Sequence, residues 1–318
     1  MIRMEHVYIL IMAGGEGTRF APLSTAEVPK QFLNLVGEGT FIQQTRLRIA
    51  NLVPADRIYV ATNERYVDLV KAQLNDIPAE NIISEPVKRN TAPSIIYAAR
   101  LIQGRDPHAV IAVLPSDHVI LRPERFLNAI RSALDHARTS GTLVTLGIMP
   151  TWPSTDYGYI MAADHPLPFV RGGSGRGRSC NVAESHIFQV SAFVEKPNSA
   201  TAARYIAEGN FYWNSGMFVW RADSLLSEVT IHLPDLHALL ANFTDSDEYR
   251  REYFLKARSI SVDYGILEKS GNVAVIPCDI GWSDIGTWEG LYNLYKGGKV
   301  VIAPHVVAVM QKIQGDSI

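Results

Sequence analysis

The sequence predicts an α/β fold in which a largely parallel sheet is covered by helices on both faces. Short runs of apolar, mostly β-branched residues recur along the chain, and amphipathic helical patterns separate the early runs. Continuous apolar runs of this length are typical of strands that are buried on both faces. After Leu146 the runs follow one another with less helical sequence between them, which predicts an antiparallel or mixed second half.

Seven apolar runs are expected to form strands. They are residues 7–12, 58–62, 110–115, 143–148, 190–196, 217–220 and 273–277. Between the early runs, four stretches have the apolar spacing of helices, namely residues 40–50, 64–75, 92–103 and 124–139. We expect residues 1–288 to form one domain and residues 289–318 a short appendage that packs or dimerises. The apolar stretch 300–313 suggests the remnant of a small β-element.

Composition argues against several classes of protein. A net charge of −2 gives no electrostatic footprint for nucleic acid. The two cysteines, Cys180 and Cys278, lack the spacing of a metal site and suit a reducing compartment. The apolar run from Val7 to Ala13 is too short to span a membrane or to form a signal sequence. We therefore expect a soluble, cytoplasmic protein without a nucleic-acid or membrane partner.

The strand at residues 7–12 leads into the glycine-rich stretch GGEGTR, residues 14–19, and VPKQF with Lys30 follows. Its three glycines leave backbone N–H groups free to converge on an anion, because no Cβ blocks the approach. The spacing does not fit GxGxxG, where Phe20 takes the third glycine's position, and it does not fit a P-loop. Two interpretations stay open on spacing alone: a phosphate cradle completed by the arginine and the lysine, or a glycine turn beside a surface lysine.

Two aspartates are candidate ligands of a divalent cation. Asp117 follows the expected strand at residues 110–115, and ligands of open parallel sheets bind outside the carboxyl ends of the strands. Asp284 lies in a tight loop, GWSDIG, that would hold its side chain close to a ligand. Mg²⁺ prefers one or two carboxylates together with phosphate oxygens and water. The alternatives are that Asp117 only caps a turn and that Asp279 takes the place of Asp284.

Further polar groups follow the later apolar runs. Glu195 and Lys196 end one run, Asn214 stands in an expected turn before the strand at residues 217–220, and Gly158 lies between two tyrosines. A carboxylate or an amide can hydrogen-bond hydroxyl groups, and a lysine can pair with a phosphate. Each signal is weak, since a Glu-Lys pair is more often a surface ion pair. Together they predict a small-molecule site at one edge of the sheet.

The chain resembles the bacterial mannose-1-phosphate guanylyltransferases, or GDP-mannose pyrophosphorylases, in eight segments: MAGGEGTRFAPLSTAEVPKQFL, EPVKRNTAPS, LPSDHVI, YGYI, FVEKPN, YWNSGMF, SVDYGILEK and GWSDIGTW. The resemblance runs from about Tyr8 to Trp288. GGxGTR with PKQ is typical of sugar nucleotidyltransferases in general, whereas EPVxRNTAP and WNSGMF indicate the guanylyltransferases. The resemblance implies a Rossmann-like, mixed-sheet sandwich of the nucleotide-diphospho-sugar transferase type, here with a short C-terminal appendage.

The resemblance also implies roles for residues in the matching segments. Arg19 and Lys30 would contact phosphates as catalytic residues, and Asp117 and Asp284 would bind Mg²⁺. The nucleotide-binding residues would be Gly14, Gly15, Gly17, Thr18, Glu85, Arg89, Asn90 and Thr91. The sugar-phosphate-binding residues would be Gly158, Glu195, Lys196, Asn214 and Asp263.

The implied reaction transfers GMP from GTP to α-D-mannose 1-phosphate and gives GDP-mannose and pyrophosphate. The sugar phosphate needs no general base for its in-line attack, because the second pKa of a phosphate monoester is near 6. A homodimer is implied as well. Two features depart from the family pattern: Ala21 stands where many relatives have Trp, and the chain stops at Ile318, so the isomerase activity of longer relatives is not expected.

Three alternatives stand beside this function. The same fold would serve another nucleotide or another sugar 1-phosphate, because spacing does not choose the base. A catalytically silent sugar-nucleotide sensor should have lost the lysine or the aspartates, but Lys30, Asp117 and Asp284 are all present. An NAD-dependent oxidoreductase is disfavoured because the GxGxxG fingerprint fails.

Overall fold

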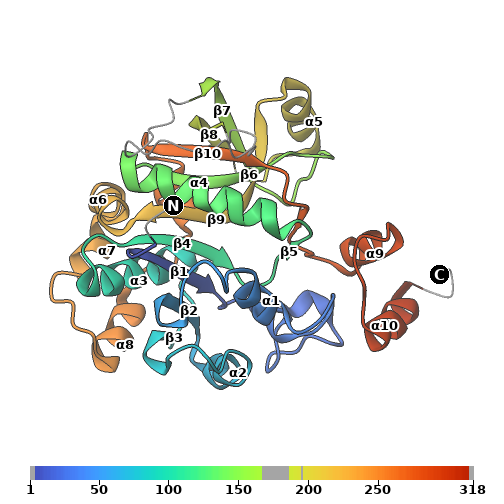
Figure 1. Ribbon diagram of the computed structural model, residues 1–318, viewed down its shortest axis with the longest axis horizontal. Helices are drawn as coiled ribbons and strands as arrows, with labels where there is room; N and C mark the ends of the chain where they lie inside the picture. Colours follow the sequence, from blue (N-terminus) through green and yellow to red (C-terminus); the bar gives the residue numbers. More distant parts are fainter. Residues whose placement is uncertain (1–3, 167–185, 195, 315–318) are drawn as a thin grey trace, which may run out of the picture.

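A nine-stranded mixed sheet forms the middle layer of the computed structural model, which describes residues 4–166, 186–194 and 196–314 (Figure 1). The strand order across the sheet is β3-β2-β1-β4-β9-β6-β10-β8-β7. The strands are β1 (Val7–Met12), β2 (Ile58–Asn63), β3 (Ile82–Glu85), β4 (Val110–Pro115), β6 (Leu143–Ile148), β7 (Tyr159–Pro166), β8 (Phe188–Val194), β9 (Phe211–Arg221) and β10 (Val273–Cys278). A separate pair consists of β5 (Val119–Ile120) and β11 (Trp282–Ser283).

The first four strands are parallel and grow outward from β1 in two directions. β2 and β3 follow on one side of β1, whereas β4 pairs with β1 on the other side. The direction of growth therefore reverses between β1 and β4. Ligands of open α/β sheets bind at such a switch point, outside the carboxyl ends of the strands. The loops that follow Met12 and Pro115 flank this position.

The second half of the sheet is mixed, as predicted. β9 is antiparallel to β4, β6 and β7, and β10 is parallel to β6 but antiparallel to β8. The prediction that Asn214 lies in a turn is wrong, because β9 begins at Phe211. Asn214 pairs with Gly147 of β6, next to a shift in the strand register. The strand therefore already includes Asn214 and does not start at residue 217.

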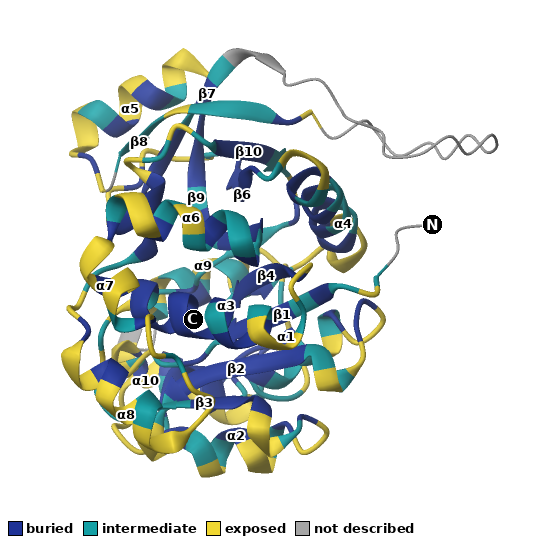
Figure 2. Ribbon diagram, turned by 90° about the vertical axis from the view of Figure 1, so that its left-hand side faces the viewer, coloured by how far each residue is buried: buried dark blue, intermediate teal, exposed yellow. Residues whose placement is uncertain are grey.

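Helices cover both faces of the sheet, and their outer sides are exposed while most strands are buried; β8, near one edge, is half-buried (Figure 2). The helices are α1 (Phe41–Arg48), α2 (Val67–Gln73), α3 (Thr91–Arg105), α4 (Pro123–Ser140), α5 (Ser199–Glu208), α6 (Ala222–His232), α7 (Pro234–Leu239), α8 (Asp247–Lys256), α9 (Trp288–Lys296) and α10 (Pro304–Gln314). The short helical turns are η1 (Thr18–Phe20), η2 (Lys30–Phe32), η3 (Ala55–Arg57), η4 (Glu64–Tyr66), η5 (Ala79–Asn81) and η6 (Asp263–Leu267). The four predicted helices correspond to α1 to α4.

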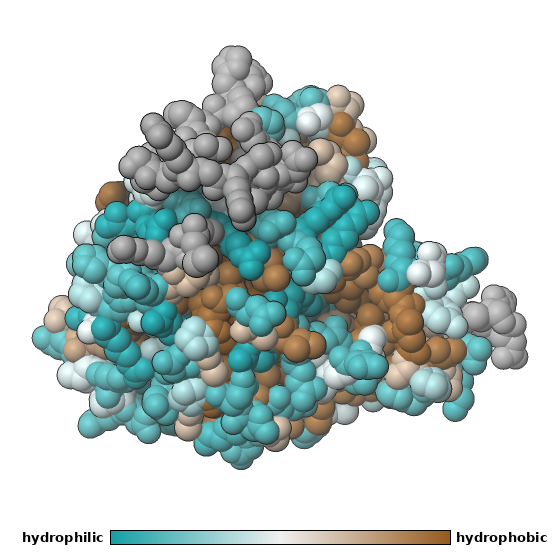
Figure 3. All heavy atoms as spheres, viewed as in Figure 1, coloured by the Kyte–Doolittle hydropathy of each residue, from teal (hydrophilic) through white to brown (hydrophobic). Residues whose placement is uncertain are grey.

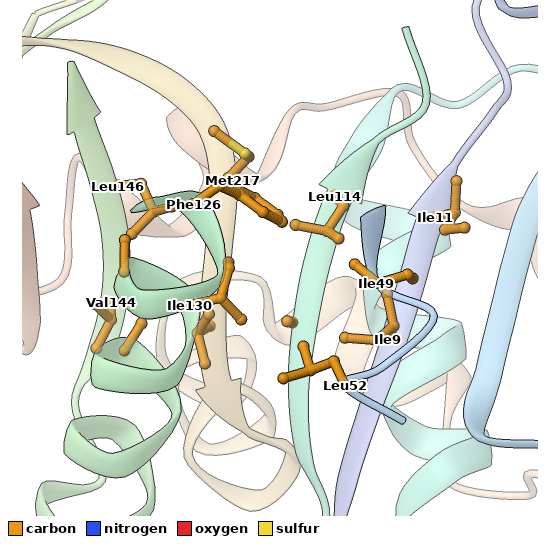
Figure 4. Packing of buried hydrophobic residues seen from close by; sticks show 14 of the residues in the cluster. Ile9, Ile11, Ile49, Leu52, Leu114, Phe126, Ile130, Val144, Leu146 and Met217 are labelled. Atoms are coloured by element: carbon orange, nitrogen blue, oxygen red, sulfur yellow. The ribbon is translucent and has the colours of Figure 1, made fainter. Parts of the chain in front are cut away.

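Each face of the sheet has its own apolar core. On one face, Ile49 and Leu52 at the end of α1 and Phe126 of α4 pack over β1, β4 and β6 (Figure 4). On the other face, α3, α6, α7 and α8 pack over the alternate strand residues, with Tyr97 and Trp220 among the largest buried side chains. Within the described part of the chain, no helix combines the length and the apolar character that crossing a membrane requires.

The C-terminal helices α9 and α10 pack against the segment between β1 and α1. Leu291, Val306 and Met310 form a buried cluster with Phe20 and Phe41. Figure 3 shows apolar residues gathered at this junction on the face in view. The appendage therefore supports the segment that contains the glycine-rich loop.

The expectation of a β-element in residues 300–313 is wrong, because Pro304–Gln314 form α10. The buried residues Val306 and Met310 are four positions apart, which is the spacing of one helix face. The indole of Trp288 donates a hydrogen bond to the carbonyl oxygen of Ala21 at 3.0 Å. The indole of Trp288 thus contacts Ala21, the position at which the family resemblance implies a Trp. The division into a domain of residues 1–288 and an appendage of residues 289–318 stays a prediction.

Candidate active site

The glycine-rich loop after β1 is shaped by its glycines and by Gln31. Gly17 has a φ of 49°, and a Cβ on it would lie 2.6 Å from the backbone nitrogen of Lys30. Only glycine fits there without displacing the lysine. The side-chain amide of Gln31 donates to the carbonyl oxygens of Ala13 at 2.9 Å and Gly15 at 2.8 Å. These contacts fix the path of the loop from its inner side.

Lys30 lies at the start of η2 and exposes only 5% of its side chain. Its Nζ donates hydrogen bonds to Asp117 Oδ2 at 3.2 Å and to the backbone carbonyl oxygen of Asp284. The rings of Phe20 and Phe41 lie 5.8 and 5.2 Å from Nζ, within the range at which an aromatic face attracts a cation. The structure therefore brings the predicted lysine and both predicted metal ligands together.

Asp117 follows the carboxyl end of β4, as the sequence predicts. Burial raises the pKa of its carboxyl, but the opposing effects, of which the charge of Lys30 is the largest, together hold that pKa below its usual range. The neighbouring His118 accepts a hydrogen bond on Nδ1 from Trp282 Nε1 at 3.0 Å. Burial also lowers the pKa of His118, so the imidazole is neutral at physiological pH. Asp117 is thus an ionised carboxylate beside a neutral histidine.

Asp284 is held through one oxygen of its carboxylate. The hydroxyl of Tyr157 donates to Oδ1 at 2.8 Å, and burial together with the charge of Asp284 raises the pKa of Tyr157, which therefore stays a donor. The next residue, Ile285, has a φ of 39°, which is unfavourable for a β-branched side chain. A Cβ on Gly286 would lie 3.1 Å from an Arg19 guanidinium nitrogen and 3.5 Å from Asp284 Oδ2. The bare Cα of Gly286 therefore allows Arg19 and Asp284 to approach the same point.

We call Arg19, Lys30, Asp117 and Asp284 the charged cluster. Among the residues that the structure describes, no three His, Cys, Asp or Glu side chains are grouped so that they could hold a metal ion by themselves. Mg²⁺ usually keeps several waters and binds one or two carboxylates together with phosphate oxygens. The carboxylates of Asp117 and Asp284 therefore fit a magnesium ion that is shared with a phosphorylated ligand.

Three of the predicted sugar-phosphate residues meet near η6. The Asn214 side chain donates to Asp263 Oδ1 at 2.7 Å, and the Asn214 backbone N–H donates to the carbonyl oxygen of Gly158 at 2.8 Å. Lys196 follows β8 with a φ of 43°. Glu195 lies outside the described residues, so nothing tests its predicted role. Asn214 and Asp263 together present amide and carboxylate groups of the kind that bind hydroxyls.

A pocket of about 390 Å³ lies beside the glycine-rich loop, where β1, β2 and β3 end. We call it the base pocket; it is lined by Gly14, Glu16, Asn63, Glu64, Arg65, Tyr66, Pro86, Val87 and Lys88. Glu85 lies directly behind Gly14, because a Cβ on that glycine would be 3.9 Å from Glu85 Oε2. Burial raises the pKa of Glu85 to about 7, although a hydrogen bond from Ser94 opposes the shift. Glu85 does not itself line the pocket, so its buried carboxyl lies one layer behind Gly14.

Arg89, Asn90 and Thr91 attach the loop between β3 and α3 to neighbouring elements. The Arg89 guanidinium donates to two backbone carbonyl oxygens at the end of α8, at 2.9 and 2.8 Å. Asn90 caps α3, and the hydroxyl of Thr91 accepts a hydrogen bond from the backbone of Val262 at 2.9 Å. None of these three residues lines the base pocket. Their role as nucleotide ligands stays a prediction.

Sequence reasoning missed two residues of this site. Gln31 follows Lys30 directly, and an amide between a lysine and the apolar Phe32 is a signal of a buried polar contact. Tyr157 precedes Gly158, but the sequence indicates only the glycine as a candidate site residue. The phenol of Tyr157 reaches a residue 127 positions away, so no local pattern marks it.

The fold and the charged cluster define an α/β protein whose charged side chains gather at the switch point of its sheet. The family model described as nucleotidyl transferase matches residues 8–297, and the chain belongs to this family.

Curated relatives include the mannose-1-phosphate guanylyltransferases of Sinorhizobium fredii and Escherichia coli K12. The first is 40% identical over 89% of this chain and 54% of its own length. The second is 41% identical over 91% of this chain and 59% of its own length. The chain therefore spans between about half and three-fifths of the length of these two relatives.

Solved structures show the same fold. A crystal structure described as mannose-1-phosphate geranyltransferase from Thermus thermophilus is 30% identical, with a TM-score of 0.77, over 91% of this chain and 79% of that one. A structure described as mannose-6-phosphate isomerase from Helicobacter pylori is 24% identical, with a TM-score of 0.68, over 87% of this chain and 99% of that one. The second likeness concerns the fold alone.

Proposed function

We propose that the chain transfers GMP from GTP to α-D-mannose 1-phosphate and produces GDP-mannose and pyrophosphate. The observation that carries this proposal is the charged cluster. Lys30 contacts Asp117 and Asp284, which lie 87 and 254 positions away in the sequence, at the edge of the sheet where ligands bind. The names of the curated relatives support this choice of substrates.

The charge distribution suits an attack of one phosphate on another. The phosphate of the sugar is already an anion at neutral pH, so the reaction depends on alignment and charge neutralisation. Lys30 is fixed and buried, and it would stabilise the charge that develops on the α-phosphate. Arg19 is exposed at the tip of the glycine-rich loop, where it would bind the departing pyrophosphate.

A divalent cation belongs to this proposal, and members of the family generally use one. We assign Mg²⁺ to Asp117 and Asp284; when bound, it would neutralise phosphate charge between substrate and protein. Lys30 holds both aspartate segments in place through its two hydrogen bonds.

The base pocket would hold guanine, and Glu85 would select it. Guanine presents two adjacent donors, N1–H and the 2-amino group, and an ionised carboxylate accepts from both. Gly14 has no side chain between Glu85 and the pocket. The backbone of Gly14, Gly15, Gly17 and Thr18 would surround the phosphates.

The sugar phosphate would bind at the other end of the charged cluster. Asn214 and Asp263 are hydrogen-bonded to each other and would bind hydroxyl groups of the sugar, beside the backbone of Gly158. Lys196 and Glu195 complete this proposed site. We also propose that the enzyme is a cytoplasmic homodimer, on the basis of the family resemblance.

Pyrophosphate release tests the proposed function. The protein is incubated with Mg²⁺, mannose 1-phosphate and each common nucleoside triphosphate in turn, and the sugar phosphate is then exchanged. Release with GTP only, blocked by EDTA, would support the proposal. Release with another nucleotide would preserve the mechanism and contradict the choice of guanine. No release from folded protein would favour a silent sugar-nucleotide sensor.

A further inference from the structure

Tyr157 lies at the active site and has no role in the function proposed above. Its ring is half-buried between Trp213 and Trp282, with ring centroids 5.0 and 5.1 Å away. Trp152 contacts two of these rings, with its centroid 4.4 Å from Trp213 and 6.3 Å from Tyr157. The ring is therefore held in one position, and its hydroxyl is directed at Asp284.

The Tyr157 hydroxyl bonds one of the two carboxylate oxygens of Asp284. Oδ1 accepts this hydrogen bond at 2.8 Å, while Oδ2 lies slightly nearer to Gly286, at 3.5 Å against 3.8 Å from a Cβ built there. A carboxylate with one oxygen fixed by a neutral donor cannot rotate freely about its last bond. Donors of this kind orient metal-binding carboxylates, and their removal typically weakens metal binding or activity about 10- to 100-fold.

The same aromatic group also connects the two candidate metal ligands. Trp282, which contacts Tyr157, donates its indole N–H to His118, the residue after Asp117. β11 and β5 pair through Trp282 and Ile120, which ties the two aspartate segments together by their backbones. A change at Tyr157 therefore acts on Asp284 directly, while Asp117 keeps its hydrogen bond from Lys30.

We propose that Tyr157 is a positioning residue that holds the Asp284 carboxylate in the orientation needed to bind the divalent cation. This proposal rests on the proposed function, because that function gives Asp284 its cation. Tyr157 is not a catalytic residue, since its hydroxyl acts through Asp284 and not on the substrate. It sets how tightly the cation binds, and it leaves the rate at saturating cation unchanged.

Tyr157→Phe tests this role, because it removes one hydroxyl and keeps the ring. The matched control is Tyr159→Phe, which removes another buried hydroxyl from the same segment, one that donates to the Ser154 carbonyl oxygen at 3.0 Å and does not touch Asp284. Two measurements are made on wild type and both variants. One is the Mg²⁺ dependence of pyrophosphate release at saturating substrates. The other is the rise of Tm with Mn²⁺ at a fixed excess of pyrophosphate, which supplies the phosphate oxygens that the cation needs beside the carboxylates.

Tyr157→Phe is expected to shift the half-saturating Mg²⁺ and Mn²⁺ concentrations upward by about 10- to 100-fold, with kcat at saturating Mg²⁺ close to wild type. Tyr159→Phe should keep both half-saturating concentrations, even if its Tm in the absence of metal falls. Metal curves of Tyr157→Phe that overlay those of wild type would overturn the proposal, and so would a lower kcat with unchanged metal dependence. A wild-type Tm that does not respond to Mn²⁺ in the presence of pyrophosphate would also overturn it, because Asp284 would then hold no cation for Tyr157 to orient.

These outcomes are separable from the proposed function. If wild type releases no pyrophosphate with any pair of substrates, the proposed function fails. The Mn²⁺ titrations of Tm still compare Tyr157→Phe with wild type in that case, so the role of Tyr157 is decided without turnover.

Discussion

The charged cluster and the base pocket lie at the same edge of the sheet, but they hold their charges differently. Within the charged cluster, Lys30 exposes 5% of its side chain and lies 3.2 Å from Asp117, which exposes 38%, while Arg19 is exposed. Glu16, Arg65 and Lys88 expose between 51% and 60%, and the two ion pairs that join them measure 3.9 and 3.8 Å. Buried, fixed charges act strongly on a ligand, whereas water and salt screen exposed ones. The difference suggests that the cluster governs rate, while the pocket and Glu85 govern the choice of nucleotide.

The largest effect is expected at Lys30. Lys30→Met should lower kcat about 10²- to 10³-fold, or about 3–4 kcal/mol, because it removes a preorganised charge from the reacting phosphate. Steady-state pyrophosphate release measures the change, and circular dichroism establishes that the variant is folded. The matched control is Lys71→Met, which alters an exposed lysine of α2 and should keep the wild-type rate. A near-normal kcat in Lys30→Met would remove the cluster from the mechanism.

The next effect is expected at Glu85, which is buried behind Gly14 of the base pocket. Glu85→Gln should lower kcat/KM for GTP by about 10- to 100-fold, since a hydrogen bond to a charged acceptor contributes about 1.5–3 kcal/mol. Because kcat depends on the other region, it should change little. Competition between GTP and ATP measures the selectivity, and Glu80→Gln at an exposed carboxylate serves as the control. Unchanged selectivity would show that the base is recognised elsewhere.

The pH dependence of GTP binding is a second test of the role of Glu85 at the base pocket. Burial raises the pKa of Glu85 to about 7, so the carboxyl is protonated below that pH and loses an acceptor for the base. The KM for GTP should therefore rise as the pH falls through about 7. Glu85→Gln should lack this rise while keeping the pH dependence that belongs to the phosphates. Parallel profiles in both proteins would contradict the assignment.

A change of similar free energy, in stability and not in kinetics, is expected at Gly17, the glycine that contacts Lys30. Gly17→Ala should lower the free energy of unfolding by about 1–3 kcal/mol, because it combines a left-handed φ with a Cβ 2.6 Å from Lys30. Gly15→Ala is the matched control, since its Cβ would meet nothing within 4 Å, and it should stay within about 1 kcal/mol of wild type. Urea unfolding measures both. Equal losses would mean that the loop is not fixed at Gly17.

The smallest effect is expected among the exposed charges. Glu16→Gln removes both ion pairs of the base pocket and should change stability by less than about 1 kcal/mol, because exposed pairs contribute little. The KM for GTP should change by less than about 5-fold, which corresponds to the same free energy. Thermal unfolding and initial-rate kinetics measure these quantities. A loss as large as that of Lys30→Met would erase the distinction between the two regions.

The elements that sequence predicts best are those whose burial is uniform. β1, β4 and β6 are apolar throughout because helices cover both of their faces, so the run itself marks the strand. β3 is absent from the sequence prediction, since its four residues, IISE, are too few to separate from a loop. The apolar sequence of α10 suggests a β-element because valines dominate it, but its buried face follows helical spacing. Local composition misleads where tertiary packing decides between the two.

The site shows the same limit. Lys30, Asp117 and Asp284 come from separate motifs, and the structure brings all three together. The partners that orient them escape prediction, because Gln31 and Tyr157 act through contacts that only the folded chain creates. Sequence motifs therefore predict which groups are present, whereas their orientation depends on neighbours from distant segments.

The long sequence separations within the charged cluster have a consequence for the order of folding. Lys30 meets Asp117 across 87 positions but meets Asp284 across 254. During synthesis the amino-terminal strands emerge first, and contacts between distant positions form late. A nascent chain can therefore bury Lys30 against Asp117 long before Asp284 is available. In the proposed function, activity should therefore appear only after synthesis has passed Asp284 and this residue has packed against Lys30.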